Sequence, residues 1–126
     1  LAPYLKEGGG VLYAAMPDPS TSAYARENVE AFRAAFVERP QTYGDVRITV
    51  ASRDSAGVAP DGSADVVLTF RNVHTWMAGG YAEKIFRDAY RALKPGGVLG
   101  VEQHRLPSSQ DQDLLARSGY VQEGYV

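Results

Sequence analysis

Two apolar runs within residues 63–104 flank a stretch with helical periodicity, and this pattern constrains the fold more than any other. The first run, Val66-Val67-Leu68, is unbroken, which is typical of a strand that is covered on both faces of a parallel sheet. Residues 98–101 have the same character. Between the runs, apolar side chains recur at the spacing of one helix face: Ala82, Ile85, Phe86, Ala89 and Leu93. The stretch therefore predicts a strand–helix–strand unit with two buried strands.

The predicted helix is followed by the turn sequence Lys94-Pro95-Gly96-Gly97. A proline clashes with a continuing helical turn and disfavours the helical conformation of the residue before it. Proline and glycine also stand where a type II turn requires them, with glycine supplying the positive φ. We therefore expect the helix to end before this turn and the second strand to begin after it.

The upstream residues extend the alternation of strands and helices. The apolar run at residues 11–15 follows Gly8-Gly9-Gly10, which we interpret as a helix-to-strand turn. A helix is expected over about residues 23–38, because apolar side chains recur there at helical intervals, and Pro40 should stop it. Residues 46–50 alternate apolar and polar, which predicts a strand with one solvated face near a sheet edge. The pattern predicts an α/β fold: a doubly wound, mostly parallel sheet with helices on both faces.

Composition narrows the class of protein further. The chain has 126 residues, enough for one domain with a single core, and a formal net charge of −2, which argues against a nucleic-acid surface built on bulk positive charge. It contains no cysteine, so disulfides and thiol nucleophiles are excluded. No apolar run approaches the roughly 18 residues that a membrane helix needs. We expect a cytoplasmic protein that binds neither nucleic acid nor membrane, although an export signal upstream of Leu1 stays open.

The same central stretch resembles a known family. Asp65-Val66-Val67 leading to Asn72-Val73-His74, and Arg91-Ala92-Leu93-Lys94-Pro95-Gly96-Gly97 before a strand, are similar to the fourth and fifth strand regions of Rossmann-like, class I S-adenosylmethionine-dependent methyltransferases. The sequence of residues 70–76 most resembles that of a bacterial group of predicted methyltransferases with unassigned substrates. The resemblance implies S-adenosylmethionine as the cofactor and methyl transfer to a small-molecule acceptor.

The resemblance also implies that the domain, residues 1–126, is incomplete at both ends. Residues 11–15 match the second strand of the family, so its first strand and glycine-rich loop would precede Leu1. In the family, that first strand lies between the second and the fourth. We therefore expect a gap beside the strand at residues 11–15, or an unusual pairing that fills it, such as one from a second chain in a homodimer.

Ligands of open α/β sheets bind beyond the carboxyl ends of the strands, which selects a small set of cofactor candidates. Asp18 follows the first apolar strand and either accepts hydrogen bonds from the ribose hydroxyls or merely organises a turn between prolines. Asp54 follows the next strand and either matches, within one residue, a family aspartate that often binds the adenine amino group, or caps the loop. Phe70, Arg71 and Asn72 follow the central strand, where the family places its cofactor cleft.

The candidate catalytic residues are His74, Glu102 and His104. His104 is expected to face His74, because neighbouring parallel strands lie about 4.8 Å apart. A histidine–carboxylate pair would act as a general base on an acceptor hydroxyl or amine. Two histidines and Glu102 also suggest a metal site, but their spacing lacks helical regularity, so we favour the base and predict no metal.

Two other functions stay open at this point. A nicotinamide-dependent α/β reductase would share the fold but needs a G-x-G-x-x-G loop after a first strand, and the sequence contains none. A non-catalytic domain that has lost its cofactor is the other possibility. Its motivation is that Met16 stands where the family usually has an acidic residue, and that the glycine-rich loop is missing.

Overall fold

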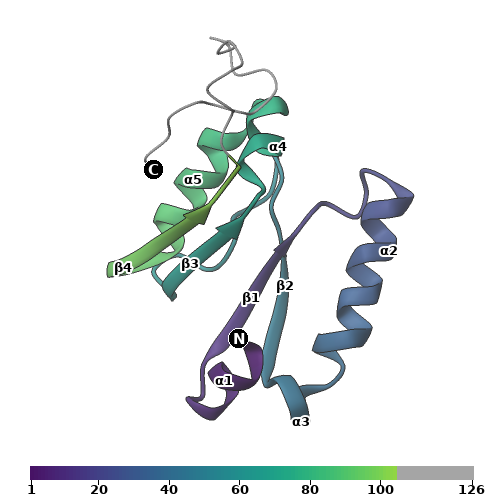
Figure 1. Ribbon diagram of the computed structural model, residues 1–126, viewed down its shortest axis with the longest axis vertical. Helices are drawn as coiled ribbons and strands as arrows, with labels where there is room; N and C mark the ends of the chain where they lie inside the picture. The colour runs from purple at the N-terminus through teal and green to yellow at the C-terminus, as the bar shows by residue number, and fades with distance from the viewer. Residues whose placement is uncertain (105–126) are drawn as a thin grey trace. The chain divides into compact units, whose positions relative to one another are not determined.

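The computed structural model describes residues 1–104, and these form two compact units. The first unit is Leu1–Ala59, and the second begins at Pro60. Each unit is built on one pair of parallel strands, as Figure 1 shows. The α/β class and the parallel strand pairing predicted from the sequence are therefore confirmed.

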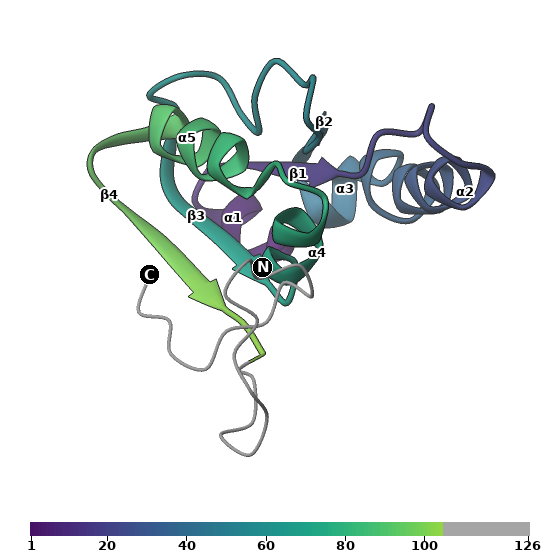
Figure 2. The same ribbon diagram turned by 90° about the horizontal axis from the view of Figure 1, so that it is seen from above.

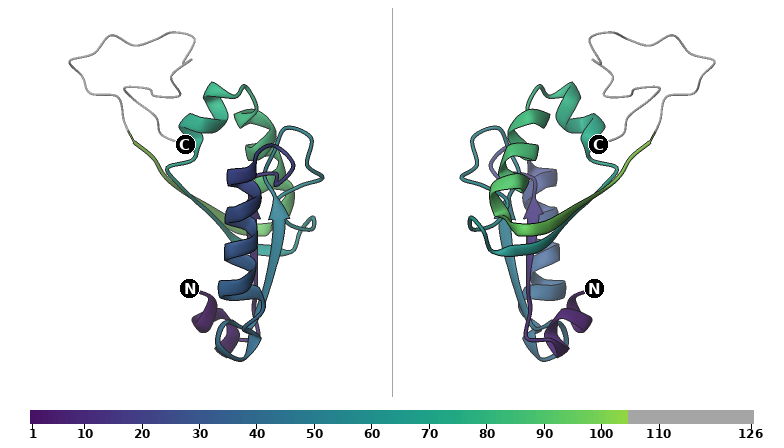
Figure 3. Two further views of the ribbon diagram at one scale, coloured as in Figure 1. Left: turned by 90° about the vertical axis from the view of Figure 1, so that its right-hand side faces the viewer. Right: turned by 90° about the vertical axis from the view of Figure 1, so that its left-hand side faces the viewer.

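The first unit pairs two strands that are separated by helices in the sequence. Residues Val11↔Asp45 through Met16↔Val50 are partners in a regular parallel register. The helix that follows the first of these strands, at residues 23–37, runs back alongside the strand pair, whereas the two short helices lie at the end where the strands begin (Figures 1 and 3). The elements are α1 (Ala2–Glu7), β1 (Val11–Met16), α2 (Ala23–Phe32), the π-helical turn η1 (Arg33–Val37), α3 (Pro40–Tyr43) and β2 (Asp45–Val50).

The predicted helix at residues 23–38 is confirmed as α2 continued by η1. The Ser22 hydroxyl caps its start by accepting from the Ala25 N–H at 3.0 Å. Ala25 and Val29 lie on its buried face, as the helical spacing predicts. Near its end, the Phe36 ring contacts two other aromatic rings, those of Phe32 and Tyr43, with centroid distances of 4.7 and 5.0 Å. Aromatic contacts of this kind fix the last turns of the helix against α3.

The glycine run before β1 is a helix-to-strand turn, as predicted. The Gly10 N–H donates to the Leu5 carbonyl at 2.8 Å, which satisfies an orphan carbonyl at the end of α1. Gly9 has φ +70, a conformation that glycine adopts without steric cost. This run connects two elements of the first unit and does not open a helix, so it is not a phosphate-binding loop of the dinucleotide type.

The second unit is the strand–helix–strand unit that the sequence predicts, with one short helix added. Its strands are partners from Val66↔Val98 to Phe70↔Glu102 in a parallel register, and the longer helix lies along them (Figure 2). The elements are β3 (Ala64–Phe70), α4 (Val73–Ala78), α5 (Ala82–Ala92) and β4 (Leu93–Glu102).

The predicted turn lies inside the irregular first half of β4. Strand pairing begins at Leu93, five residues before the apolar run, with a register shift between Ala64 and Val66. Gly96 takes φ +83, the positive value that the type II turn was expected to require. The helix still ends before the proline, at Ala92, because the residues that follow are extended.

Within residues 1–104, a helix covers one face of the β3–β4 pair and not the other. Helix α5 packs on the covered face through Ile85, Ala89 and Ala92, which are all buried. On the opposite face the apolar side chains are about half exposed: Val66 54%, Leu68 47%, Phe70 56% and Val98 59%. The prediction that these strands are buried on both faces is therefore wrong for the described residues, because a helix lies on only one side of them.

The strand at residues 11–16 has one unpaired edge among the described strands, in line with the first of the two expectations for it. Among the strands of residues 1–104, β1 pairs only with β2, and β3 only with β4. Each of β1 and β3 therefore has a second edge that no described strand occupies.

A separate finding concerns membranes. Within the described part of the chain, no helix combines the length and the apolar character needed to cross a bilayer.

Candidate functional site

The carboxyl ends of β3 and β4 are held together by one backbone hydrogen bond. The Arg71 N–H donates to the Glu102 carbonyl at 2.8 Å, directly after β3 ends. Arg71 has φ +57, the only positive φ at a non-glycine residue in the described chain. Backbone strain of this kind clusters at functional sites. The left-handed conformation of Arg71 turns the chain sharply from β3 into the helix that follows, α4.

Asn72 builds the turn that follows. Its carbonyl accepts from the N–H groups of Thr75 and Trp76 at 3.0 and 3.2 Å, which starts α4. Its side-chain Nδ2 donates to the hydroxyl of buried Thr69 at 3.5 Å, a long contact. Asn72 therefore has a local structural role, and its predicted contact with a cofactor stays a prediction.

Two histidines meet at this end of the unit, with a glutamine against one of them. The imidazole rings of His74 and His104 lie 6.0 Å apart between centroids, so the prediction that they face each other is confirmed. Gln103 Nε2 lies 2.8 Å from His74 Nδ1. Gln103 Oε1 accepts from the Val73 N–H at 3.1 Å, the first residue of α4. The carboxamide thus connects the end of β4 to the start of α4 and to the imidazole.

The side chain that contacts His74 from the end of β4 is the Gln103 carboxamide, one residue after Glu102. Successive side chains of a strand point to opposite faces, so Glu102 and Gln103 diverge. Glu102 is the register partner of Phe70 and is exposed, as Phe70 is. Gln103 was missed as a site residue, although alternation from Val101 onward places it on the face of β4 that α5 covers. The predicted role of Glu102 in a histidine–carboxylate base stays a prediction.

Trp76 belongs to the packing of the unit. Its ring contacts the Phe86 ring edge-on at a centroid distance of 6.0 Å, and both side chains are partly buried. This pair fixes α4 against α5. His74 is therefore carried by a helix whose other side is anchored.

A second pair of strand ends lies in the first unit. The Ala51 N–H donates to the Met16 carbonyl at 2.9 Å and joins the ends of β1 and β2. Asp18 follows Met16 and accepts from both the N–H and the hydroxyl of Ser20, at 2.8 and 2.7 Å. The hydrogen bond from the Ser20 hydroxyl and, to a smaller extent, the one from the Ser20 N–H hold the pKa of Asp18 below its ordinary value of 3.8. Asp18 thus organises the turn, as one of the two interpretations of this residue expected.

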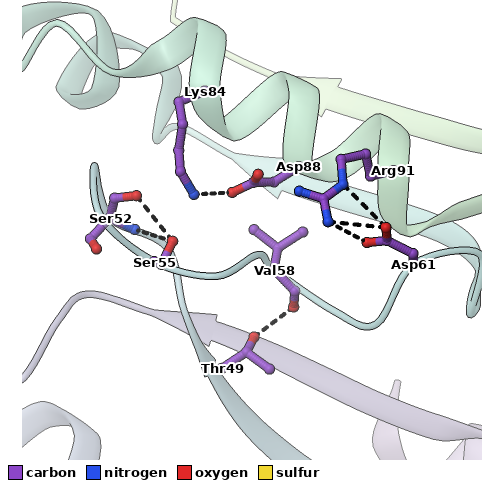
Figure 4. Close-up of polar contacts among 8 residues, drawn as sticks. All are labelled: Thr49, Ser52, Ser55, Val58, Asp61, Lys84, Asp88 and Arg91. Atoms are coloured by element: carbon purple, nitrogen blue, oxygen red, sulfur yellow. Dashed lines mark hydrogen bonds and ion pairs between the residues drawn. The ribbon is translucent and has the colours of Figure 1, made fainter.

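Asp54 lies in an exposed turn after β2. The turn is closed by its neighbours, because the Ser55 hydroxyl donates to the Ser52 carbonyl at 3.0 Å and accepts from the Ser52 N–H at 3.2 Å (Figure 4). Further along, the Thr49 hydroxyl donates to the Val58 carbonyl at 2.6 Å. These bonds fix the loop backbone that carries the Asp54 carboxylate.

Within residues 1–104, no group of three or more His, Cys, Asp or Glu side chains is arranged to hold a metal ion. The pair of histidines with Glu102 does not form such a group.

The sequence matches one known protein family. The family described as "Methyltransferase domain" matches residues 1–101, which is most of the chain and includes strands of both units. The chain therefore belongs to this family, the class I methyltransferases, whose members use S-adenosylmethionine as the methyl donor. The match sets the nicotinamide-dependent alternative aside. Neither the curated proteins nor the solved structures include a significant match to the chain.

Proposed function

We propose that this methyltransferase domain transfers the methyl group of S-adenosylmethionine to a small-molecule acceptor, which lies against His74 and His104. The observation that carries the proposal is the meeting of these two imidazoles, 6.0 Å apart, at the carboxyl ends of β3 and β4. Ligands of open α/β sheets bind at such strand ends. A neutral imidazole can also accept or donate a proton near pH 7, which suits a transfer that releases a proton from the acceptor.

Two carboxylates fit the adenosine part of the cofactor. Both hydrogen bonds from Ser20 end on Asp18 Oδ1, and the lowered pKa keeps this carboxylate charged. The other oxygen, Oδ2, would accept from a ribose hydroxyl. Asp54 is exposed after the end of β2 and would accept from the adenine amino group. In the second unit, the family resemblance separately predicts cofactor contacts for Phe70, Arg71 and Asn72, at the end of β3.

The acceptor would be handled by polar side chains of the second unit. When bound, the cofactor supplies an electrophilic methyl group on a sulfonium. The protein's part is to align the acceptor atom with that group and to manage the proton that it loses. His74 lies on a helix anchored by Trp76, and His104 is the second residue after β4, so each histidine is in or close to a regular element.

The test is calorimetric titration of the intact protein with S-adenosylmethionine. Asp18→Ala and Asp54→Ala should each weaken binding about tenfold, since one hydrogen bond to a charged group is worth about 1.5 kcal/mol. Asp45→Ala is the matched control, because Asp45 begins β2 and lies at the opposite end of the strand, paired with Arg47 at 2.6 Å. Its affinity should stay within about twofold of the unchanged protein.

The acceptor half of the proposal has its own measurement. His74→Ala should keep cofactor affinity, since His74 is assigned to the acceptor, but should slow the formation of S-adenosylhomocysteine in a metabolite extract. Absence of any cofactor binding by the intact protein would refute the proposal and leave the non-catalytic alternative. Unchanged turnover in His74→Ala would remove His74 from the acceptor site.

A further inference from the structure

We propose that Gln103 is a positioning residue that holds His74 as a neutral imidazole with its proton on Nε2. His74 then faces the acceptor as a hydrogen-bond donor and not as the general base. The inference deepens the proposed function and rests on it for the presence of an acceptor at His74. The assignment of the proton itself rests only on hydrogen-bond geometry in the second unit.

The orientation of the Gln103 carboxamide follows from its backbone partner. The Val73 N–H can only donate, so the carboxamide atom 3.1 Å away must be the oxygen. The other end of the same group is then Nε2, which can only donate. Because the two atoms of an amide cannot be exchanged without placing two donors against each other, the Val73 N–H fixes which end faces the imidazole.

The tautomer of His74 follows in turn. Gln103 Nε2 lies 2.8 Å from His74 Nδ1, so Nδ1 must accept and carries no proton. In a neutral imidazole the proton is then on Nε2. One directional chain of hydrogen bonds therefore runs from the backbone at the start of α4, through the carboxamide of Gln103, to the imidazole.

The framework around this chain keeps it in place. Gln103 directly follows the last residue of β4, whose carbonyl is tied to the Arg71 N–H at 2.8 Å. Val73 and His74 are the first two residues of α4, and Val73 is buried. A side chain with supported partners on both sides loses little freedom on binding a ligand, which is the condition for an oriented catalytic group.

The consequence for chemistry is a division of roles between the two histidines. A general base must present an unprotonated nitrogen to the acceptor, and the Nε2 atom of His74 already holds a proton. His74 can instead donate to a lone pair of the acceptor atom and orient it. His104 is then the histidine in this pair to which the proton of the acceptor would pass.

The experiment is nitrogen NMR of the intact, uniformly 15N-labelled protein. Long-range 1H–15N correlations separate protonated from unprotonated ring nitrogens, and the chain has only two histidines, so His104→Gln assigns the signals of His74. We expect His74 to show an unprotonated Nδ1 and a protonated Nε2 in the unchanged protein. A protonated Nδ1, or two nitrogens averaged between both states, would overturn the proposal without any variant of Gln103.

Matched variants test the cause. Gln103→Glu keeps the shape but presents only acceptor oxygens, so the proton of His74 should move to Nδ1. Gln103→Leu should give a mixture of tautomers. Glu102→Gln, a change on the opposite face of β4, should leave the tautomer as it is. An unchanged tautomer in Gln103→Glu would overturn the role of Gln103, whereas failure of S-adenosylmethionine to bind would refute the proposed function alone.

Discussion

The Arg71 N–H donates to the Glu102 carbonyl at 2.8 Å, and the same residue adopts φ +57, which turns the chain that follows it. A left-handed conformation costs an ordinary residue about 1–2 kcal/mol, since its Cβ approaches the following carbonyl. The bond joins the exit of β3 to the last residue of β4, so it sets the direction in which α4 begins. The strain therefore lies at the point where the strand ends meet the helix that carries His74.

Replacing this residue with glycine should stabilise the fold. Arg71→Gly relieves the strain of about 1–2 kcal/mol but adds about 0.5–1 kcal/mol of chain entropy, so the free energy of unfolding should rise by about 0.5–1 kcal/mol. Arg71→Val, a β-branched residue at the same φ, should lower it by about 1 kcal/mol or more. Urea denaturation measures both. Equal stabilities of the two variants, or a more stable Arg71→Val, would contradict the assignment of strain to Arg71.

A second prediction compares two ion pairs of the same spacing in α5, and Figure 4 shows the first of them, Lys84 with Asp88. Lys84 pairs with Asp88, whose side chain is only 5% exposed. Lys84→Met should cost on the order of 2 kcal/mol, because it leaves a buried carboxylate without its charged partner. Adding Asp88→Leu should recover much of this loss. Thermal or urea unfolding is the measurement.

The control for that prediction is the pair between Glu83 and Arg87 in the same helix. Their side chains are 86% and 65% exposed, and the contact measures 2.5 Å. Exposed pairs contribute little, so Arg87→Met should change the free energy of unfolding by less than about 0.5 kcal/mol. Equal effects of Lys84→Met and Arg87→Met would show that burial does not decide the outcome here.

A third prediction separates two glycines of β4. A Cβ at Gly97 would lie 3.0 and 3.1 Å from two backbone oxygens, those of Lys94 and Asp65. A Cβ at Gly100 would meet only the Leu68 Cδ2 atom, at 2.7 Å, and Leu68 is half exposed and free to turn. Gly97→Ala should therefore destabilise by at least about 1 kcal/mol more than Gly100→Ala in urea denaturation. The reverse order would contradict the described approach of the strands.

The sequence predicts these strands and this helix well, because periodicity depends on which residues are apolar and not on what covers them. Val66 and Leu68 show the limit of that signal. Their unbroken apolar run predicts burial on both faces, yet the described residues cover one face only. The sequence of a strand does not show which elements pack against its two faces. The site shows a similar limit. His74 and His104 follow from their places after strands, whereas the part played by Gln103 depends on strand alternation and on a backbone N–H.

The acid sensitivity of the first unit should depend in part on Asp18. Its pKa is lowered in the folded protein, chiefly by the Ser20 hydroxyl, so the carboxylate stabilises the fold fully above its ordinary value of 3.8. That contribution is lost as the pH falls through the lower, folded value. In Asp18→Asn, the loss of stability below pH 3.8 should be smaller than in the unchanged protein, as measured by urea midpoints across pH.

Ser20→Ala is the control for the cause of that shift. It removes the hydroxyl donor but keeps the backbone one, so most of the acid-dependent difference should disappear while Asp18 remains. An acid profile of Ser20→Ala that matches the unchanged protein would show that the hydroxyl does not set the pKa of Asp18.

The tautomer proposed for His74 also predicts which kind of atom is methylated. If Nε2–H donates to the acceptor atom, that atom must hold one lone pair for His74 and another for the attack on the sulfonium. Oxygen has two lone pairs or more, whereas a neutral amine nitrogen has one, which the imidazole would block. Incubation of the intact protein with radiolabelled S-adenosylmethionine and a metabolite extract should therefore yield methyl ethers or methyl esters. His74→Gln, which keeps an N–H donor at a similar reach, should retain more turnover than His74→Leu. Methylamines as the only products would contradict the donor role of His74.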